Sequence, residues 1–267
     1  MIHLKSIALG KRRGDDSAYP FNIPVIRALT PLELTTPLTF FVGENGSGKS
    51  TLLEAIAFAA GSITAGSEGV DQDETLASVR RLGSALKLSW TKRTRRGFFL
   101  RAEDYFGYAK RMSKIREGLE RDLQDIDHEY AGRSEMARNL ARMPFLREIH
   151  AMQAQYGGDL DNYSHGESFF TFFRARFVPD GLYLLDEPEA PLSPLRQLAF
   201  ITLLREMLAL NAQFIIATHS PILMAFPGAT IYTFDQPPIH PVSYGELEHV
   251  TLTRDFLNDP DQFLRHL

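Results

Sequence analysis

Residues 43–50 form a glycine-rich loop, Gly-Glu-Asn-Gly-Ser-Gly-Lys-Ser, which narrows the folds that this chain can adopt more than any other segment. A continuous apolar and β-branched run over residues 38–42 precedes it, and a helix-forming stretch over residues 50–60 follows it. Glycine, four residues, glycine, lysine and serine between a strand and a helix is the pattern of a phosphate-binding P-loop. The glycines let backbone amides wrap around phosphate groups, and the helix adds its positive end. The sequence therefore predicts a buried strand, a phosphate-binding turn and a helix in this order.

Each residue type in the loop suits one part of a triphosphate. Lys49 supplies a mobile positive charge to the β- and γ-phosphates, Ser50 offers a hydroxyl to Mg²⁺, and Thr51 is placed to contact the α-phosphate. The backbone of the remaining loop residues is expected to enclose the phosphates: Gly43, Glu44, Asn45, Gly46, Ser47 and Gly48.

Two further stretches end in polar side chains where an α/β sheet places its ligands, at the carboxyl ends of strands. Residues 182–185 form an apolar strand followed by Asp186 and Glu187, and residues 214–218 form a strand followed by His219. We expect Asp186, on the strand beside the P-loop strand, to hold Mg²⁺, and Glu187 to orient a water molecule and accept its proton. His219 could contact the γ-phosphate, although a lone histidine is more often a structural hydrogen-bonding group.

The segment Tyr163-Ser164-His165-Gly166-Glu167 precedes a helix-like apolar run at residues 169–173. As local structure, Ser164 is an N-cap and Glu167 completes a capping box. As a functional element, a helix N-terminus that carries Ser164 and Gly166 can bind a γ-phosphate presented by another subunit. The two interpretations are compatible.

The first half of the chain outside the P-loop mixes short strands with a long helical stretch. Residues 3–9 and 25–29 are β-like and suggest an antiparallel N-terminal edge region, and residues 86–90 and 98–101 suggest two strands around a basic turn. Apolar positions spaced by three or four between residues 110 and 130 predict a helix. A second helix is expected over residues 134–141, with Pro144 opening or breaking the next element.

The last third alternates strands at residues 182–185, 214–218 and 231–234 with a helix over residues 194–210, for which Ser193 is the expected N-cap. This alternation predicts an α/β fold with a mixed, mostly parallel sheet and helices on both faces. We expect residues 1–267 to form a single domain that carries a helical insertion at residues 104–160.

Composition excludes several classes of site. The chain has no cysteine, so disulfides, thiolate zinc sites and cysteine nucleophiles are excluded. No apolar stretch reaches the about 20 residues that span a bilayer, and the N-terminus lacks a secretory signal, so we expect a cytoplasmic protein without membrane insertion. The net charge is −4, yet residues 80–147 carry 17 Lys and Arg against 9 Asp and Glu. This basic stretch fits a nucleic acid or an acidic partner, and equally the solvated faces of surface helices.

The P-loop, the segment 163–167, Asp186-Glu187-Pro188 and His219 together resemble the ABC-type ATPase family, over about 180 of 267 residues. Gly-Glu-Asn-Gly-Ser-Gly-Lys-Ser-Thr and Thr-His-Ser-Pro are typical of its soluble RecF, SMC and OLD-like branch, and small stand-alone bacterial ATPases look most similar. The resemblance implies ATP and Mg²⁺ as cofactors. It also implies an ATP-dependent head-to-tail homodimer in which Ser164 and Gly166 act on the nucleotide of the other subunit.

The sequence departs from the family pattern in two places. One is the segment 163–167, which corresponds to the signature of the family, and the other follows the strand that ends in Asp186. Tyr163 and His165 replace the usual leucine and second glycine, which makes this loop bulkier. Ser193 stands where an aspartate is usual, which puts communication between the two nucleotide sites in doubt.

For two functional positions of the family, the sequence offers candidate residues without a motif that selects one of them. Glu103 is the candidate for the metal-binding Q-loop residue, and Gln72 is a weaker one. Tyr19 or Phe21 is the candidate for stacking on adenine, because both precede the P-loop by about the family's interval.

These features favour an ATPase that couples its cycle to a nucleic-acid or protein partner, of the DNA repair or defence type. The alternative is the nucleotide-binding subunit of an ABC transporter that docks on a separate membrane protein. Such subunits usually carry a Leu-Ser-Gly-Gly-Gln signature and an evident Q-loop glutamine, and both are missing here. A third possibility is a toxin–antitoxin, anti-phage or plasmid-encoded ATPase whose effector is a neighbouring gene product.

Overall fold

The computed structural model describes residues 1–10, 17–64, 77–156 and 165–265. Its central sheet has the strand order β5-β6-β7-β3-β8-β9, in which the first five strands are parallel and β9 is antiparallel to β8. The strands are β3 (Leu38–Val42), β5 (Gly97–Arg101), β6 (Leu182–Asp186), β7 (Gln213–Ala217), β8 (Thr230–Thr233) and β9 (His240–Pro241). The predicted α/β class with a mixed sheet is confirmed.

A second, antiparallel sheet has the order β2-β1-β4 and is built from β1 (Leu4–Leu9), β2 (Leu32–Glu33) and β4 (Leu86–Trp90). The antiparallel N-terminal region is therefore present, but it forms a sheet of its own. The strands at residues 86–90 and 97–101 are both found, and each belongs to a different sheet because β4 pairs with β1 while β5 pairs with β6.

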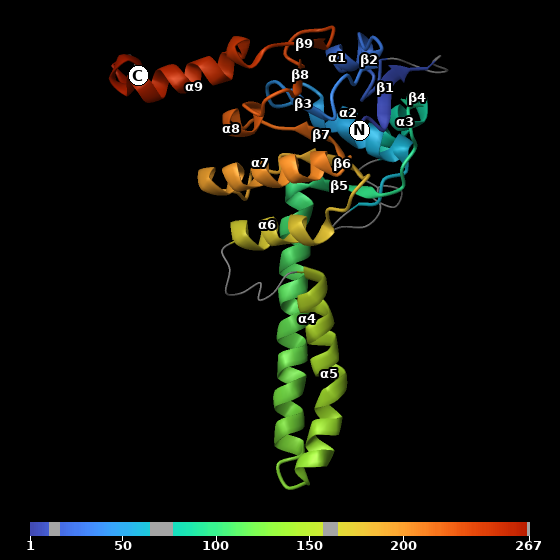
Figure 1. The fold of residues 1–267 in the computed structure, drawn as a ribbon, viewed down its shortest axis with the longest axis vertical. Coiled ribbons are helices and arrows are strands. Elements are labelled where there is room, and N and C mark those ends of the chain that lie inside the picture. Colours follow the sequence, from blue (N-terminus) through green and yellow to red (C-terminus); the bar gives the residue numbers. More distant parts are fainter. Residues whose placement is uncertain (11–16, 65–76, 157–164, 266–267) are drawn as a thin grey trace.

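Helices cover both faces of the central sheet (Figure 1). The helices are α1 (Pro24–Arg27), α2 (Lys49–Ala60), α3 (Ala77–Ala85), α4 (Ala102–Glu129), α5 (Glu135–Tyr156), α6 (His165–Arg176), α7 (Pro194–Ala209), α8 (Pro221–Met224), α9 (Glu248–Asn258) and α10 (Pro260–Leu264), with a 3-10 turn at Tyr244–Glu246.

Two hydrophobic cores lie on opposite faces of the sheet, because side chains alternate along each strand. On β3, Phe40 packs into the core shared with α6, α7 and α8, whereas Phe41 packs into the core shared with α2 and the antiparallel sheet. All five residues of β3 are buried, as are all five of β6 and of β7. Strands buried on both faces produce the continuous apolar runs seen in the sequence.

A buried amide joins the two sheets. Gln213, at the start of β7, is fully buried, and its Oε1 accepts the backbone N–H groups of His3 and Leu4 at 2.8 Å each. Its Nε2 donates to the Leu4 carbonyl at 2.9 Å. One side chain thus satisfies three backbone groups of β1 and its entry, which fixes the antiparallel sheet on the central one.

The helical stretch in the middle of the chain forms a hairpin of α4 and α5 that extends away from the sheets (Figure 1). Its small core contains Leu119, Leu123 and Ile149. The expected end of helix near Pro144 is wrong, because α5 runs unbroken past Pro144 to Tyr156. Phe145 and Leu146, directly after the proline, pack on the hairpin core, and this packing holds the helix together through the proline.

Two further predictions are wrong: the type of one element in the N-terminal half, and the place of one strand in the sheet order. The expected strand at residues 25–29 is the short helix α1, since Pro24 lies in its first turn and presets a helical φ angle. The expected strands and helix after residue 182 are found, and the Ser193 hydroxyl accepts the Arg196 N–H as an N-cap. However, the strand that ends in Asp186 is not the neighbour of β3, because β7 lies between them.

Candidate functional site

The P-loop connects β3 to α2 through glycines in backbone conformations that other residues rarely adopt. Gly43 has φ 143° and Gly48, the N-cap of α2, has φ 102°. A Cβ at Gly48 would also lie 3.0 Å from Ile23 Cγ2 and 3.2 Å from Val25 Cγ2. Glycine is therefore required there both for the turn and for the close approach of Ile23 and of α1. The resulting turn leads directly into the N-terminus of a buried helix, as a phosphate site needs.

Lys49 is the first residue of α2, and its side chain folds back over the loop. Its Nζ donates to the carbonyl oxygens of Gly43 at 2.7 Å and Glu44 at 2.8 Å. Burial lowers the pKa of Lys49, and the nearby charges of Asp186 and Glu187 partly offset this effect. The ammonium group therefore lies inside the loop, within reach of phosphates bound there.

Asp186 reaches the P-loop helix although its strand is two positions away from β3. The Ser50 hydroxyl donates to Asp186 Oδ1 at 3.1 Å. The pKa of Asp186 is raised to about 7. Burial is the main cause, the carboxylates of Glu54 and Glu187 act in the same direction, and the hydrogen bond from Ser50 partly offsets them. A buried carboxylate beside a hydroxyl is an oxygen donor pair that suits Mg²⁺, whose charge would compensate that of Asp186.

The protein alone does not make a complete metal cage at this place. Over the described parts of the chain, no group of three or more His, Asp or Glu side chains is arranged to hold a metal ion. Mg²⁺ usually binds through one or two protein oxygens together with substrate phosphates and water. Ser50 and Asp186 fit that mode of binding.

Glu187 is held in a left-handed backbone conformation at the end of β6. Its φ is 50°, an unusual value for a residue other than glycine, and its N–H donates to the Ala217 carbonyl of β7 at 2.9 Å. Such a conformation costs about 1–3 kcal/mol and is common at functional sites. It turns Glu187 away from the strand direction, and the side chain, half exposed, lines a pocket together with Lys49 and Ser50.

His219 follows β7, which pairs with β6, so the expected neighbourhood of His219 and Glu187 is found. His219 Nε2 lies 3.8 Å from Glu187 Oε1, and its backbone N–H donates to Glu189 Oε1 at 2.7 Å. Burial lowers the pKa of His219, so the ring is neutral at pH 7. Its Nε2 is buried and makes no hydrogen bond within the described residues, which leaves it available to a ligand.

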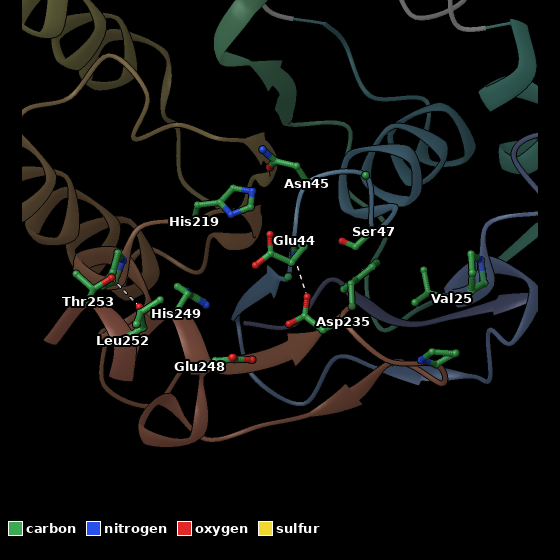
Figure 2. A pocket seen from close by; sticks show the side chains of 16 residues that line it. Val25, Glu44, Asn45, Ser47, His219, Asp235, Glu248, His249, Leu252 and Thr253 are labelled. Carbon is green, nitrogen blue, oxygen red and sulfur yellow. Dashed lines mark hydrogen bonds between the residues drawn. The ribbon is translucent and has the colours of Figure 1, made fainter. Parts of the chain in front are cut away.

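Two pockets flank the loop at Asn45 and Gly46. One, of about 680 Å³, lies between the loop, His219, Asp235 and the start of α9 (Figure 2). The charged side chains that line it include Glu44 and Glu248, and none of the described residues on its wall is a lysine or an arginine. The other, of about 600 Å³, is lined by Lys49, Ser50, Thr51, Glu187 and the segment 19–24. A triphosphate is favoured on the second side, where the ammonium group and the hydroxyls lie.

The two aromatic candidates for adenine stacking have different positions. Tyr19 lines the pocket that contains Lys49, is 47% exposed, and its hydroxyl lies 3.2 Å from Thr51 Oγ1. Phe21 instead packs against the hydrophobic core that contains α2. The geometry therefore favours Tyr19 as the residue that meets a base.

Sequence reasoning missed Asp235, which fixes the start of the P-loop from β8. Its Oδ1 accepts the Glu44 N–H at 2.7 Å, as the dashed line in Figure 2 shows, and Thr233 Oγ1 donates to its Oδ2 at 3.1 Å. Asp235 comes two residues after the last residue of β8, a parallel strand. The rule about the carboxyl ends of strands that selected Asp186 and His219 would have selected Asp235 as well.

Some of the expected residues lie outside the described parts of the chain, and others lie at the starts of helices. Ser164, Tyr163 and Gln72 are outside the described residues. Gly166 lies in the first turn of α6, and Glu103 lies in the first turn of α4, directly after β5. The helix expected after the signature segment is confirmed as α6.

Comparisons with protein families agree with the P-loop. A family model described as an AAA domain matches residues 21–85, which include the loop. A second model, described as an AAA domain, putative AbiEii toxin, Type IV TA system, matches residues 169–225, which include Asp186, Glu187 and His219. The resemblance to P-loop ATPases is thus confirmed. No curated protein matches the chain.

Solved structures that match this chain include ABC and SMC proteins. CbiO1 from Clostridium perfringens, part of the ABC transporter complex cbiONQ, is 15% identical with a TM-score of 0.48, and 100% of each chain is covered. The Smc head domain from Pyrococcus furiosus, bound to the C-terminal domain of ScpA, is 12% identical with a TM-score of 0.45, covering 96% of this chain and 100% of that one. The SMC head domain from Thermotoga maritima is 16% identical with a TM-score of 0.42, covering 91% and 100%. In the described residues, no helix combines the length and the apolar character that crossing a membrane requires.

Proposed function

We propose that this chain binds ATP with Mg²⁺ and hydrolyses it in a head-to-tail dimer, and that the cycle acts on a nucleic-acid or protein partner in the cytoplasm. The observation that supports this most is the hydrogen bond of 3.1 Å between Ser50 and Asp186. It brings a hydroxyl of the phosphate loop and a buried carboxylate of a distant strand to one place, where a single Mg²⁺ can contact both.

In this proposal each residue of the site has a separate role. The amides of the P-loop and Lys49 bind the phosphates, Ser50 and Asp186 hold Mg²⁺, and Thr51 contacts the α-phosphate. Glu187 orients the attacking water and accepts its proton, and neutral His219 donates or accepts a hydrogen bond at the γ-phosphate. Mg²⁺, when bound, supplies charge stabilisation for the transferred phosphoryl group.

The position of α6 supports the proposed dimer. The aromatic residues of α6 pack in the core on one face of the central sheet, whereas α2 packs on the other face. Gly166, in the first turn of α6, is therefore proposed to act, together with Ser164, on the nucleotide of a second subunit rather than their own. The first amides of a helix bind anions, which makes the γ-phosphate of the partner the fitting ligand.

The variant Glu187→Gln tests the catalytic assignment. We expect it to bind ATP like the wild type, to lose hydrolysis by a factor of at least about 100, and to accumulate as a dimer when ATP is added. Equilibrium binding of a fluorescent ATP analogue, phosphate release and size-exclusion chromatography measure the three properties. Normal turnover in this variant would remove Glu187 from its proposed role, and a monomer in the presence of ATP would refute the dimer.

The match to the toxin-associated family model favours a second candidate for the partner. In that case the ATPase acts with the product of a neighbouring gene, as part of a toxin–antitoxin or defence pair. Growth of cells that express the chain alone, the neighbouring product alone and both together tests this idea. Equal growth in all three would exclude it.

A further inference from the structure

The turn between β4 and β5 carries an unusual concentration of free positive charge. Lys92, Arg93, Arg95 and Arg96 are all exposed, and we call residues 92–96 the basic turn. Arg96 lies 3.9 Å from Asp180. The side chains of Lys92, Arg93 and Arg95 form no ion pair or hydrogen bond with any described residue, so their charges face solvent without compensation.

Several arginines of the α4–α5 hairpin, in contrast, have acidic partners. Four of its arginines lie within 4.0 Å of an acidic side chain of the same hairpin: Arg116 with Glu120, Arg121 with Glu117, and Arg138 and Arg142 with Asp127. The positive charges of these four arginines are therefore compensated within the hairpin. A polyanion would find uncompensated charge at the basic turn instead.

A hollow beside the basic turn offers planar surfaces. Its volume is about 450 Å³, and Trp90 and Arg93 lie on its wall. The Arg93 guanidinium group is 5.9 Å from the centroid of the Trp90 ring. The other lining residues are apolar or small, and none of the described ones is acidic: Phe58, Ala59, Gly83, Ser84, Leu86 and Leu88. Indole rings and guanidinium planes are the surfaces on which unpaired nucleobases stack.

We propose that the basic turn and this hollow bind single-stranded nucleic acid. Phosphates contact Lys92, Arg93 and Arg95, and a base enters the hollow beside Trp90. A single strand fits better than a duplex, because a duplex keeps its bases stacked and would leave the hollow empty. The inference deepens the proposed function by naming the class of partner, and it rests on that function only for the link to ATP.

The proposed site lies at the edge of the sheet opposite to the nucleotide. β5 begins with Gly97 beside Leu182 and ends with Arg101 beside Asp186, so the turn lies a strand length, about 16 Å, from the carboxyl edge. Arg101 forms an ion pair of 3.2 Å with Glu54 of α2, the helix that follows the P-loop. β5 thus connects the two sites physically, while none of the turn residues lines the pocket that contains Lys49.

Trp90 allows a direct test, because it is the only tryptophan in the chain. The full-length protein is titrated with an oligothymidine of about 20 nucleotides while tryptophan fluorescence is recorded. We expect quenching that saturates, and an affinity whose logarithm falls with the logarithm of salt with a slope of about −2, as three contacts to single-strand phosphates give. A duplex of the same length is expected to quench less.

Matched variants assign the binding to the turn. Lys92→Gln, Arg93→Gln and Arg95→Gln combined should weaken oligonucleotide binding at least about tenfold and leave basal ATP hydrolysis unchanged. The control combines Arg116→Gln, Arg121→Gln and Arg138→Gln in the hairpin, and it should bind like the wild type. Arg93→Lys keeps the charge and should reduce the quenching, because the planar group is lost.

The outcomes separate this inference from the proposed function. Absent quenching, affinity that does not change with salt, or full binding by the turn variant would overturn the inference. Equal quenching by polyglutamate would also overturn it and indicate an acidic protein partner. Oligonucleotide binding by a protein that does not hydrolyse ATP would support the inference and refute the proposed function alone.

Discussion

Asp186 and Lys49 at the carboxyl edge of the central sheet are buried, whereas Glu117 and Arg121 of the α4–α5 hairpin are exposed and pair with each other. Asp186 is 8% exposed and Lys49 is 4% exposed, and each has a pKa displaced mainly by burial. In the hairpin, the side chains of Glu117 and Arg121 are 57% and 71% exposed, and they form an ion pair one helical turn apart. Burying a charge costs free energy unless a ligand or partner compensates it, whereas a surface pair costs and contributes little. The sheet edge is therefore arranged for a ligand, and the hairpin for its own stability.

Removal of the buried ammonium group should have the strongest consequence for activity. Lys49→Ala should lower ATP hydrolysis by a factor of about 1,000 and weaken nucleotide binding, because the positive charge inside the loop is lost. The matched control is Lys114→Ala, which removes an exposed lysine of the hairpin. Its hydrolysis should equal that of the wild type. Phosphate release under saturating Mg²⁺-ATP measures the activity of both variants. Similar losses of activity in the two variants would contradict the idea that only the lysine at the sheet edge serves a ligand.

The second effect concerns stability and pH without nucleotide or Mg²⁺. Burial raises the pKa of Asp186 from 3.8 to about 7, so the native state binds its proton more tightly than the unfolded state does. The free energy of unfolding should therefore fall as pH rises from about 4 to 7, and the penalty remains at higher pH. Asp186→Asn removes this penalty and should stabilise the metal-free protein by about 4 kcal/mol at pH 8, with little gain at pH 4.

Urea unfolding in the presence of a chelator measures this difference across pH. The control in the hairpin is Asp127→Asn, whose carboxylate is 40% exposed and 3.4 Å from Arg142. It should change stability by less than about 1 kcal/mol and always toward lower stability. With Mg²⁺-ATP added, the wild type should become more stable than Asp186→Asn, because only the wild type is then stabilised by the bound ion. An Asp186→Asn protein that is less stable at pH 8 without metal would contradict the burial argument.

The parts of the site that could be predicted are those carried by local patterns. The P-loop, its strand and its helix occupy one continuous segment, so a single stretch of sequence predicts all three. Asp186 and His219 follow apolar strands, and parallel strands place their carboxyl ends at one edge of a sheet. The geometry agrees with that reasoning, because Ser50 contacts Asp186 and His219 lies near Glu187.

The parts that could not be predicted depend on contacts between distant segments. Sequence alone gives no strand order, so the position of β7 between β3 and β6 emerges only in the folded chain. Pro144 is a helix breaker by local rules, yet packing against α4 keeps α5 continuous. Asp235 could have been found by the rule that found Asp186, but its hydrogen bond to Glu44 spans 191 residues and depends on the tertiary structure.

A weaker change in stability should separate two glutamines, one in each region. Gln213→Leu leaves the buried N–H groups of His3 and Leu4 and the Leu4 carbonyl without their partner, and it should destabilise the protein by about 2 kcal/mol. Gln124→Leu, at an exposed position of α4, should change stability by no more than about 0.5 kcal/mol. Chemical unfolding followed by circular dichroism measures both. Equal effects would mean that the buried amide does not hold the two sheets together, and that the difference between sheet and hairpin is confined to the nucleotide edge.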